Sequence, residues 1–266
     1  MTATPPFARI AINMLGSAVL ALLVLPVLAV VPASFNHATF IRLPPDRVSL
    51  RWYDNFLADP EWLGALTASL NVALLAMLIA VIAGTLAAIA LERLPPRWRA
   101  PLVGLVLSPL IVPVIMLAIA LYYVARHTGL HGTVLGLALG HAVLCLPFVV
   151  INVGVSLKGI DPNLLRAAEG LGAGPWHGFR TVTLPLIIPG LAGGAVFAFV
   201  TSFDEVVLSI FLAGIQAKTL PVKMWEIIRV EFTPVAAVAS TVLLALTLVA
   251  FALVQLARRG DASEPP

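Results

Sequence analysis

Two adjacent acidic residues interrupt an apolar run in the second half of the chain. The run reads FVTSFDEVVLSIF, with Asp204 and Glu205 at its centre and Thr201 and Ser202 one helical turn before them. A charged side chain at bilayer depth costs a few kcal/mol, so such residues usually face a cavity or a protein partner. Neighbouring residues of a helix point about 100° apart. We therefore expect one carboxylate to face a pathway and the other to face a neighbouring helix.

The position of this acidic pair suits solute binding from the outer side of a membrane. Asp204 follows Pro189 by 15 residues, which is about 22 Å along a helix. A negative site there would accept a cationic solute, with Ser202, Asp204 and Glu205 as pathway or gate residues. The same residues could instead form an ion pair or a hydrogen-bonded gate between two subunits, and both interpretations remain open at this stage.

The composition defines the class of protein. The chain has 266 residues, of which 60% are hydrophobic and 11% charged, and its mean hydropathy is +1.02. Soluble domains contain roughly 25% charged residues, so the sequence predicts an integral membrane protein. Its net charge of +3 fits Lys and Arg in loops that face anionic lipid and cytoplasm. We expect no nucleic-acid partner.

Six apolar segments are long enough to cross a bilayer, which needs about 20 helical residues. We expect a single all-α transmembrane domain over residues 1–266, with spans at about 8–31, 64–90, 101–124, 132–157, 186–214 and 235–257. With the N-terminus inside, the inner segments carry nine Lys and Arg and the outer segments seven. This bias, with the helix-flanking clusters ERLPPRWR and ARRG, predicts that both termini are cytoplasmic.

A polar stretch, RAAEGLGAGPWHGFRTVTLPLIIP, separates the fourth and fifth spans. Asp161 is a favourable N-cap and Pro162 a favourable first residue, so a short helix should begin there. Gly170 and Gly172 should end this helix, because glycine adopts the backbone conformations of a C-terminal turn.

A second short helix is expected after the first. Pro175 should open it, and Pro185 should close it before the fifth span begins. Ala167 and Ala168 give the first helix a face without bulk, which would let another protein approach its backbone closely. A well-packed connector would show the same signals, so the local pattern alone leaves both interpretations open.

This stretch resembles the coupling motif of ABC importer permeases, in which Glu-Ala-Ala is followed after three residues by Gly. Here the register reads Arg166-Ala167-Ala168 and then Gly172, so arginine stands where that family usually has glutamate. Further segments, among them SPLIVPVIMLAIAL and TLPVKMWEIIR, are similar to permeases of spermidine/putrescine-type importers. The resemblance implies a type I ABC importer permease fold with six transmembrane helices and a cytoplasmic coupling loop at about 158–185.

The resemblance also implies partners and a site. The expected partners are a second permease subunit, two ATP-binding subunits, a periplasmic solute-binding protein and the lipid of a bacterial inner membrane. The expected solute is a polyamine, with another small solute of the same family as the alternative. The residues expected to couple to the ATPase are Arg166, Ala167, Ala168, Glu169, Gly172, Ala173 and Phe179.

The sequence offers no chemistry of its own for ATP hydrolysis. It contains no G-x-x-x-x-G-K-[ST] phosphate loop, so any ATP-driven work would come from a partner. It also lacks an H-E-x-x-H motif and a nucleophile–base pair, which argues against a membrane enzyme. We expect no cofactor and no metal; His127 and His131 have no third ligand nearby. An ion-coupled secondary transporter is the weaker alternative, because the chain shows no convincing internal repeat.

Polar residues and prolines elsewhere in the spans predict contacts and bends. His141, Asn152 and Asn71 are expected to form hydrogen bonds between helices. Pro109 and Pro113 are expected to kink the third span, and Pro147 the fourth.

Overall fold

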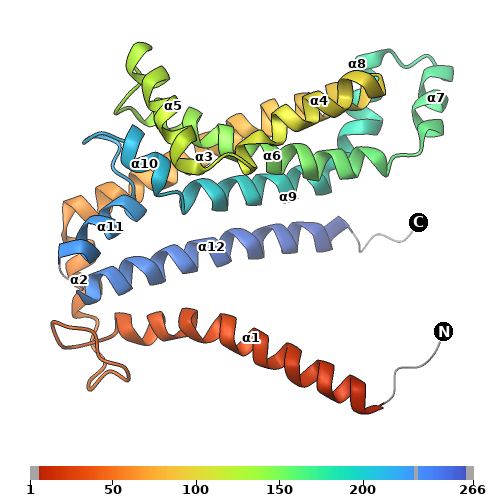
Figure 1. Cartoon of the computed structure of the whole chain (residues 1–266). Helices are drawn as coiled ribbons and strands as arrows, with labels where there is room; N and C mark the ends of the chain where they lie inside the picture. Colours follow the sequence, from red (N-terminus) through yellow and green to blue (C-terminus); the bar gives the residue numbers. More distant parts are fainter. Residues whose placement is uncertain (1–5, 231–232, 262–266) are drawn as a thin grey trace. The chain divides into compact units, whose positions relative to one another are not determined.

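The computed structural model describes residues 6–230 and 233–261, and Figure 1 shows the chain as a series of helices. In order these are α1 (Pro6–Ser34), α2 (Arg51–Ala58), α3 (Pro60–Arg93), α4 (Pro96–Leu107), α5 (Val114–His127), α6 (Val134–Lys158), α7 (Pro162–Gly170), α8 (Pro175–Gly178), α9 (Leu184–Phe203), α10 (Val207–Leu212), α11 (Leu220–Val230) and α12 (Pro234–Asp261). A 3₁₀ turn, Ser108–Leu110, follows α4, and a π turn, Phe179–Thr183, joins α8 to α9. Within the described residues there is no strand, only an isolated bridge between Asn36 and Val48.

Among the described residues, five helices are long and apolar enough to cross a membrane, and there are six spans if a bent pair of helices is counted as one. The five are Ile12–Ser34, Pro60–Arg93, Val134–Lys158, Pro175–Phe203 and Pro234–Ala252. The bent pair, Pro96–Leu110 with Val114–His127, turns by 97° at its break. The prolines at 109 and 113 lack the N–H that would continue the helix, so the predicted kink is confirmed as a full break.

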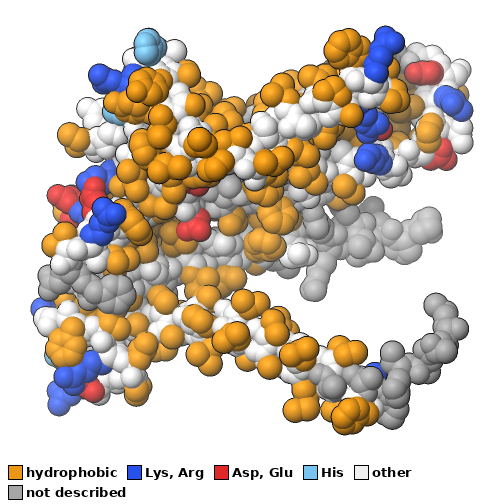
Figure 2. Space-filling view, viewed as in Figure 1, with side chains coloured by type: hydrophobic (Ala, Val, Ile, Leu, Met, Phe, Trp, Pro, Cys, Tyr) orange, Lys and Arg blue, Asp and Glu red, His pale blue; other side chains and the backbone are white. Residues whose placement is uncertain are grey.

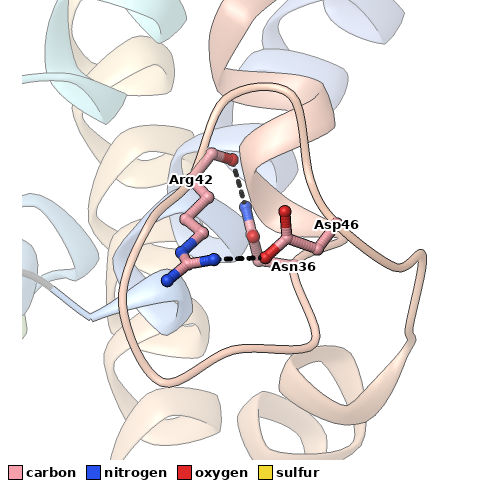
Figure 3. Close-up of polar contacts among 3 residues, drawn as sticks. All are labelled: Asn36, Arg42 and Asp46. Atoms are coloured by element: carbon pink, nitrogen blue, oxygen red, sulfur yellow. Dashed lines mark hydrogen bonds and ion pairs between the residues drawn. The ribbon is translucent and has the colours of Figure 1, made fainter.

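The chain divides into two compact units, Met1–Leu63 with Met224–Ala245, and Gly64–Lys223 with Leu246–Pro266. In the first unit, the loop between α1 and α2 is closely organised. The buried Asn36 side chain donates to the Ala33 carbonyl at 3.2 Å and to the Arg42 carbonyl at 2.9 Å. Arg42 in turn forms an ion pair with Asp46, 2.6 Å between Nη1 and Oδ2 (Figure 3).

Aromatic residues pack around α2 in the same unit. The Tyr53 hydroxyl lies 2.7 Å from the Ser34 hydroxyl, and the Phe56 and Trp62 rings lie 5.5 Å apart. Trp62 is buried because its ring packs on Phe56. It therefore belongs to the core of this unit.

The second unit is built on the antiparallel pair α6 and α9. Small residues at every fourth position of α9 (Gly190, Gly194, Ala198 and Ser202) lie against α6. A Cβ on Gly194 would lie 3.0 Å from the Cα of Val149. Such small-residue faces let membrane helices approach closely enough to pack backbone on backbone. We refer to these four residues of α9 as the small-residue face.

Hydrophobic and charged side chains occupy different parts of the surface of the second unit. Figure 2 shows hydrophobic side chains over the flanks of the long helices, whereas Lys, Arg, Asp and Glu gather around the end that carries α7. An apolar flank with charged ends is the distribution expected of a protein whose helices cross lipid.

Candidate functional site

The polar segment between α6 and α9 begins with the predicted capped helix. The Asp161 side chain accepts a hydrogen bond from the Asn163 N–H at 2.9 Å, and Pro162 occupies the first helical position of α7. Asp161 thus satisfies one of the N–H groups that a helix start leaves without an intrahelical partner. The predicted start of this helix is confirmed.

The end of α7 explains why glycine stands at position 172. The Ala173 N–H donates to the Ala168 carbonyl at 3.0 Å, and the Gly172 N–H donates to the Glu169 carbonyl at 2.9 Å. These two bonds form a Schellman motif, whose turn residue must adopt a positive φ. Gly172 has φ = +86°. The motif therefore places glycine four residues after Ala168 because the turn that ends α7 needs a residue with positive φ at that position.

The second helix of the segment differs from the prediction. Pro185 does not close it, because α8, the π turn and α9 form one continuous helix, Pro175–Phe203. Pro185 has no N–H to give to the Thr181 carbonyl, and the ladder shifts so that the Leu184 N–H reaches the Phe179 carbonyl. The π turn thus accommodates the proline within the helix. As a result, the loop is joined to the fifth span without a flexible connector.

The residues predicted to couple to an ATPase lie in a single loop but on different faces of it. Arg166, Ala167, Glu169 and Gly172 are exposed, whereas Ala168, Ala173 and Phe179 are partly buried. Phe179 packs against Trp176, with ring centroids 5.6 Å apart. A hollow of about 450 Å³ is lined by Ala168, Leu171, Gly172, Ala173, Gly174, His177 and Thr181. Four of the lining residues are glycine or alanine.

Two large apolar side chains of this segment are exposed to solvent, and one of them, Leu171, lines the hollow. Leu171 is 90% exposed and Trp176 is 72% exposed. Sequence reasoning did not single out these two residues, although a leucine and a tryptophan in a polar loop are a usable signal. Exposed apolar groups within a polar rim are typical of a protein interaction site. We call α7, α8 and the hollow between them the loop surface.

Arg166 gives the loop surface a positive charge. Its side chain is exposed and donates to the Asn163 Oδ1 at 3.4 Å, within α7. Glu169 is also exposed, and the structure does not bring its carboxylate to Arg166. The arginine is therefore available to a partner.

The acidic pair lies at a break in the fifth span, and the prediction of a continuous helix over 186–214 is wrong. α9 ends at Phe203 and α10 begins at Val207, so Asp204, Glu205 and Val206 form a break between them. The Glu205 carboxylate accepts a hydrogen bond from the Leu208 N–H at 2.9 Å. This bond satisfies an N–H at the start of α10, so the carboxylate stabilises the break itself.

The two carboxylates have different surroundings. Glu205 is half-buried and bound to backbone, whereas Asp204 is exposed, and its carboxylate makes no hydrogen bond or ion pair within the described part of the chain. The sequence could not say which of the two faces a pathway. In the structure, Asp204 is the more exposed of the two carboxylates.

Ser202 belongs to a buried polar cluster beside the break. His141 of α6 lies 2.8 Å from the Ser202 hydroxyl through Nδ1 and 3.1 Å from the Ser209 hydroxyl through Nε2. The predicted interhelical hydrogen bond of His141 is therefore confirmed. Asn152 instead donates to the Phe148 carbonyl of its own helix, and Asn71 is exposed.

Comparison with solved structures identifies the fold. A bacterial ABC transporter involved in the import of the acidic polysaccharide alginate matches over 96% of this chain and 99% of its own, with a TM-score of 0.73 and 16% identity. A methionine ABC transporter in inward-facing conformations matches with a TM-score of 0.59 and 20% identity. The chain has the type I ABC importer permease fold.

Sequence comparison then assigns the family. The spermidine/putrescine transport system permease protein PotC of Escherichia coli K12 is 32% identical over 243 residues, 91% of this chain and 92% of that protein. The putrescine permease PotI of the same strain is 31% identical over 95% of this chain and 92% of its own length. Residues 80–260 match the family of binding-protein-dependent transport system inner membrane components. The chain belongs to this family and is a multi-pass membrane permease of the ABC importer class.

Proposed function

We propose that this chain forms half of the translocation pathway of an ATP-driven importer, and that its solute is a polyamine. Its partners would be a second permease, two ATP-binding subunits and a periplasmic binding protein, with both termini in the cytoplasm of a bacterium. The observation that carries the solute proposal is the exposed, unpaired carboxylate of Asp204 at the α9–α10 break.

The chemistry of that carboxylate favours a cation. Relatives of this chain carry different solutes: PotC and PotI are named for spermidine and putrescine, whereas a molybdenum permease, ModB of Escherichia coli, is 33% identical over 65% of this chain. A carboxylate attracts an ammonium group and repels an anion. Asp204 therefore supports the polyamine assignment over an anionic solute.

The loop surface would receive the ATP-binding subunit. Its exposed Leu171 and Trp176 offer apolar contact, its hollow can accept a side chain, and Arg166 would meet an acidic group. Because the helix Pro175–Phe203 is continuous, a displacement of the loop would move α9 as a rigid body. The break that contains Asp204 follows the C-terminal end of this helix.

The proposal is tested by exchanging each carboxylate separately. In proteoliposomes that contain the whole complex, Asp204→Asn should lower ATP-driven spermidine uptake at least ~10-fold, equivalent to about 1.4 kcal/mol. Glu205→Gln should be much milder, because the amide oxygen can still accept the Leu208 N–H. Equal uptake by Asp204→Asn and wild type would refute a role for Asp204 in the pathway. Loss of complex assembly in Asp204→Asn would favour the intersubunit gate instead.

A further inference from the structure

His141 is a fully buried histidine that contacts both sides of the α9–α10 break. It lies on α6 with 0% exposure. Its Nδ1 lies 2.8 Å from the Ser202 hydroxyl and 3.1 Å from the Ser202 carbonyl, and its Nε2 lies 3.1 Å from the Ser209 hydroxyl. Ser202 is in the last turn of α9 and Ser209 is in α10. One imidazole therefore connects three helices.

One neutral tautomer of the imidazole satisfies the hydrogen bonds of both serine hydroxyls. A neutral imidazole has one donor nitrogen and one acceptor nitrogen, and the Ser209 hydroxyl donates its single proton to the Glu205 carbonyl, 2.9 Å away within the break. With the proton on Nε2, the ring donates to the Ser209 oxygen, and Nδ1 accepts from the Ser202 hydroxyl. In this tautomer a chain of hydrogen bonds connects α6 through Ser209 to the backbone of the break.

This geometry restrains the direction of Asp204. The break is only Asp204–Val206, and its flanking residues are fixed on one side through Ser202 and on the other through Ser209. The Glu205 carboxylate is fixed separately by the Leu208 N–H. With both flanks held to α6, the backbone at Asp204 has a defined position relative to α6 and α9, which limits the region that its exposed carboxylate can reach.

We propose that His141 is a positioning residue for transport, which holds the α9–α10 break in the geometry that presents Asp204 to the solute. The transport role rests on the proposed function of Asp204, whereas the restraint on the break does not. His141 touches the break from α6 and need not touch the solute. Its removal should loosen the break locally while the rest of the α6–α9 pair remains packed.

The restraint is measured by thiol labelling in the purified complex. In a Cys145→Ala background, Val206→Cys places the only thiol reporter of the chain in the break, and Val153→Cys places it at a fully buried site of α6. We expect His141→Ala to raise the rate of maleimide labelling at position 206 at least ~5-fold and to leave position 153 unlabelled. Ser209→Ala, which removes the α10 contact, should have a similar effect at position 206. Asn152→Ala, whose side chain bonds within its own helix, is the matched control and should change neither rate.

Two conservative variants separate positioning from simple packing. An asparagine amide reaches roughly the place of Nδ1, and a glutamine amide reaches roughly that of Nε2. His141→Gln should therefore keep the Ser209 contact and retain more spermidine uptake than His141→Asn.

The double variant His141→Ala with Ser209→Ala tests whether the two residues act through one contact. Its uptake should fall no more than ~2-fold below that of His141→Ala alone, because both changes remove the same contact.

The outcomes distinguish this proposal from the proposed function. Unchanged labelling at position 206 in both His141→Ala and Ser209→Ala would overturn the restraint, whatever Asp204→Asn does. Labelling that rises equally at positions 153 and 206 would also overturn it, because it would show general loosening. If labelling rises only at position 206 while Asp204→Asn transports normally, the restraint stands and the solute role of Asp204 fails. If His141→Ala does not assemble, Ser209→Ala provides the same test.

Discussion

Gly190 of the small-residue face gives the sharpest test of how the second unit is packed. A Cβ at this position would lie 2.7 Å from the Asn152 backbone carbonyl and would also overlap the Ser156 hydroxyl. The serine side chain can rotate, but the carbonyl oxygen is part of α6 and cannot move alone. Gly190→Ala must therefore push α6 and α9 apart by about 0.7 Å to reach ordinary van der Waals contact, which begins at 3.4 Å. Overpacking of this kind costs about 1–3 kcal/mol.

A matched glycine isolates the packing cost. Gly154 lies in α6, and a Cβ there would meet nothing within 4 Å. Alanine is favoured over glycine in a helix by about 1 kcal/mol, and both variants receive this gain. The free energy of unfolding of Gly190→Ala should therefore lie about 1–3 kcal/mol below that of Gly154→Ala.

The assay is equilibrium unfolding of the purified chain in detergent, with SDS as denaturant and tryptophan fluorescence as the signal. The comparison is made between the two alanine variants. Equal stability of Gly190→Ala and Gly154→Ala would refute the close approach of α6 and α9. A serine at position 190 should be at least as destabilising as alanine, because it carries the same Cβ.

Other parts of the structure predict further outcomes. Gly172→Val should disrupt the turn that ends α7, because a β-branched residue is strained at φ = +86°. We expect the affinity for the ATPase subunit, measured by titration, to fall at least ~10-fold. Gly170→Ala, where a Cβ meets open space, is the control and should bind with close to wild-type affinity. Asn36→Ala should remove the donor to the buried Ala33 carbonyl and to the Arg42 carbonyl, at a cost of about 1–3 kcal/mol. Hydrogen exchange over residues 35–50 should accelerate ~10-fold or more, and unchanged exchange would refute the role of Asn36. Arg166→Glu should weaken docking to an acidic ATPase groove, and a compensating Lys or Arg in that groove should restore it.

Local signals were sufficient for the first half of the loop. Asp161 and Pro162 define the start of α7, and Gly172 defines its end, through interactions that span only a few residues. Such interactions can be predicted from the sequence because the residues that make them are neighbours along the chain. The family resemblance likewise predicted the fold and the class of transporter correctly.

The sequence predicted neither the continuity of the helix at Pro185 nor the break at Asp204. Pro185 was expected to end a helix, but the π turn before it keeps the helix continuous. Asp204 and Glu205 were expected within a helix, because the apolar run continues past them. The break is held by His141, 61 residues before Ser202, and periodicity cannot reveal such a contact. The small-residue face was visible in the sequence as Gly190, Gly194 and Ala198 and was overlooked.

ATP-driven uptake by the reconstituted complex tests the central claim most directly. The chain would be assembled with its second permease and ATP-binding subunits in proteoliposomes, and supplied with binding protein loaded with labelled spermidine. Our account predicts uptake that requires both ATP hydrolysis and the loaded binding protein, and that is lost when residues 166–174 are deleted. Uptake driven by an ion gradient without ATP, or full uptake after that deletion, would contradict it.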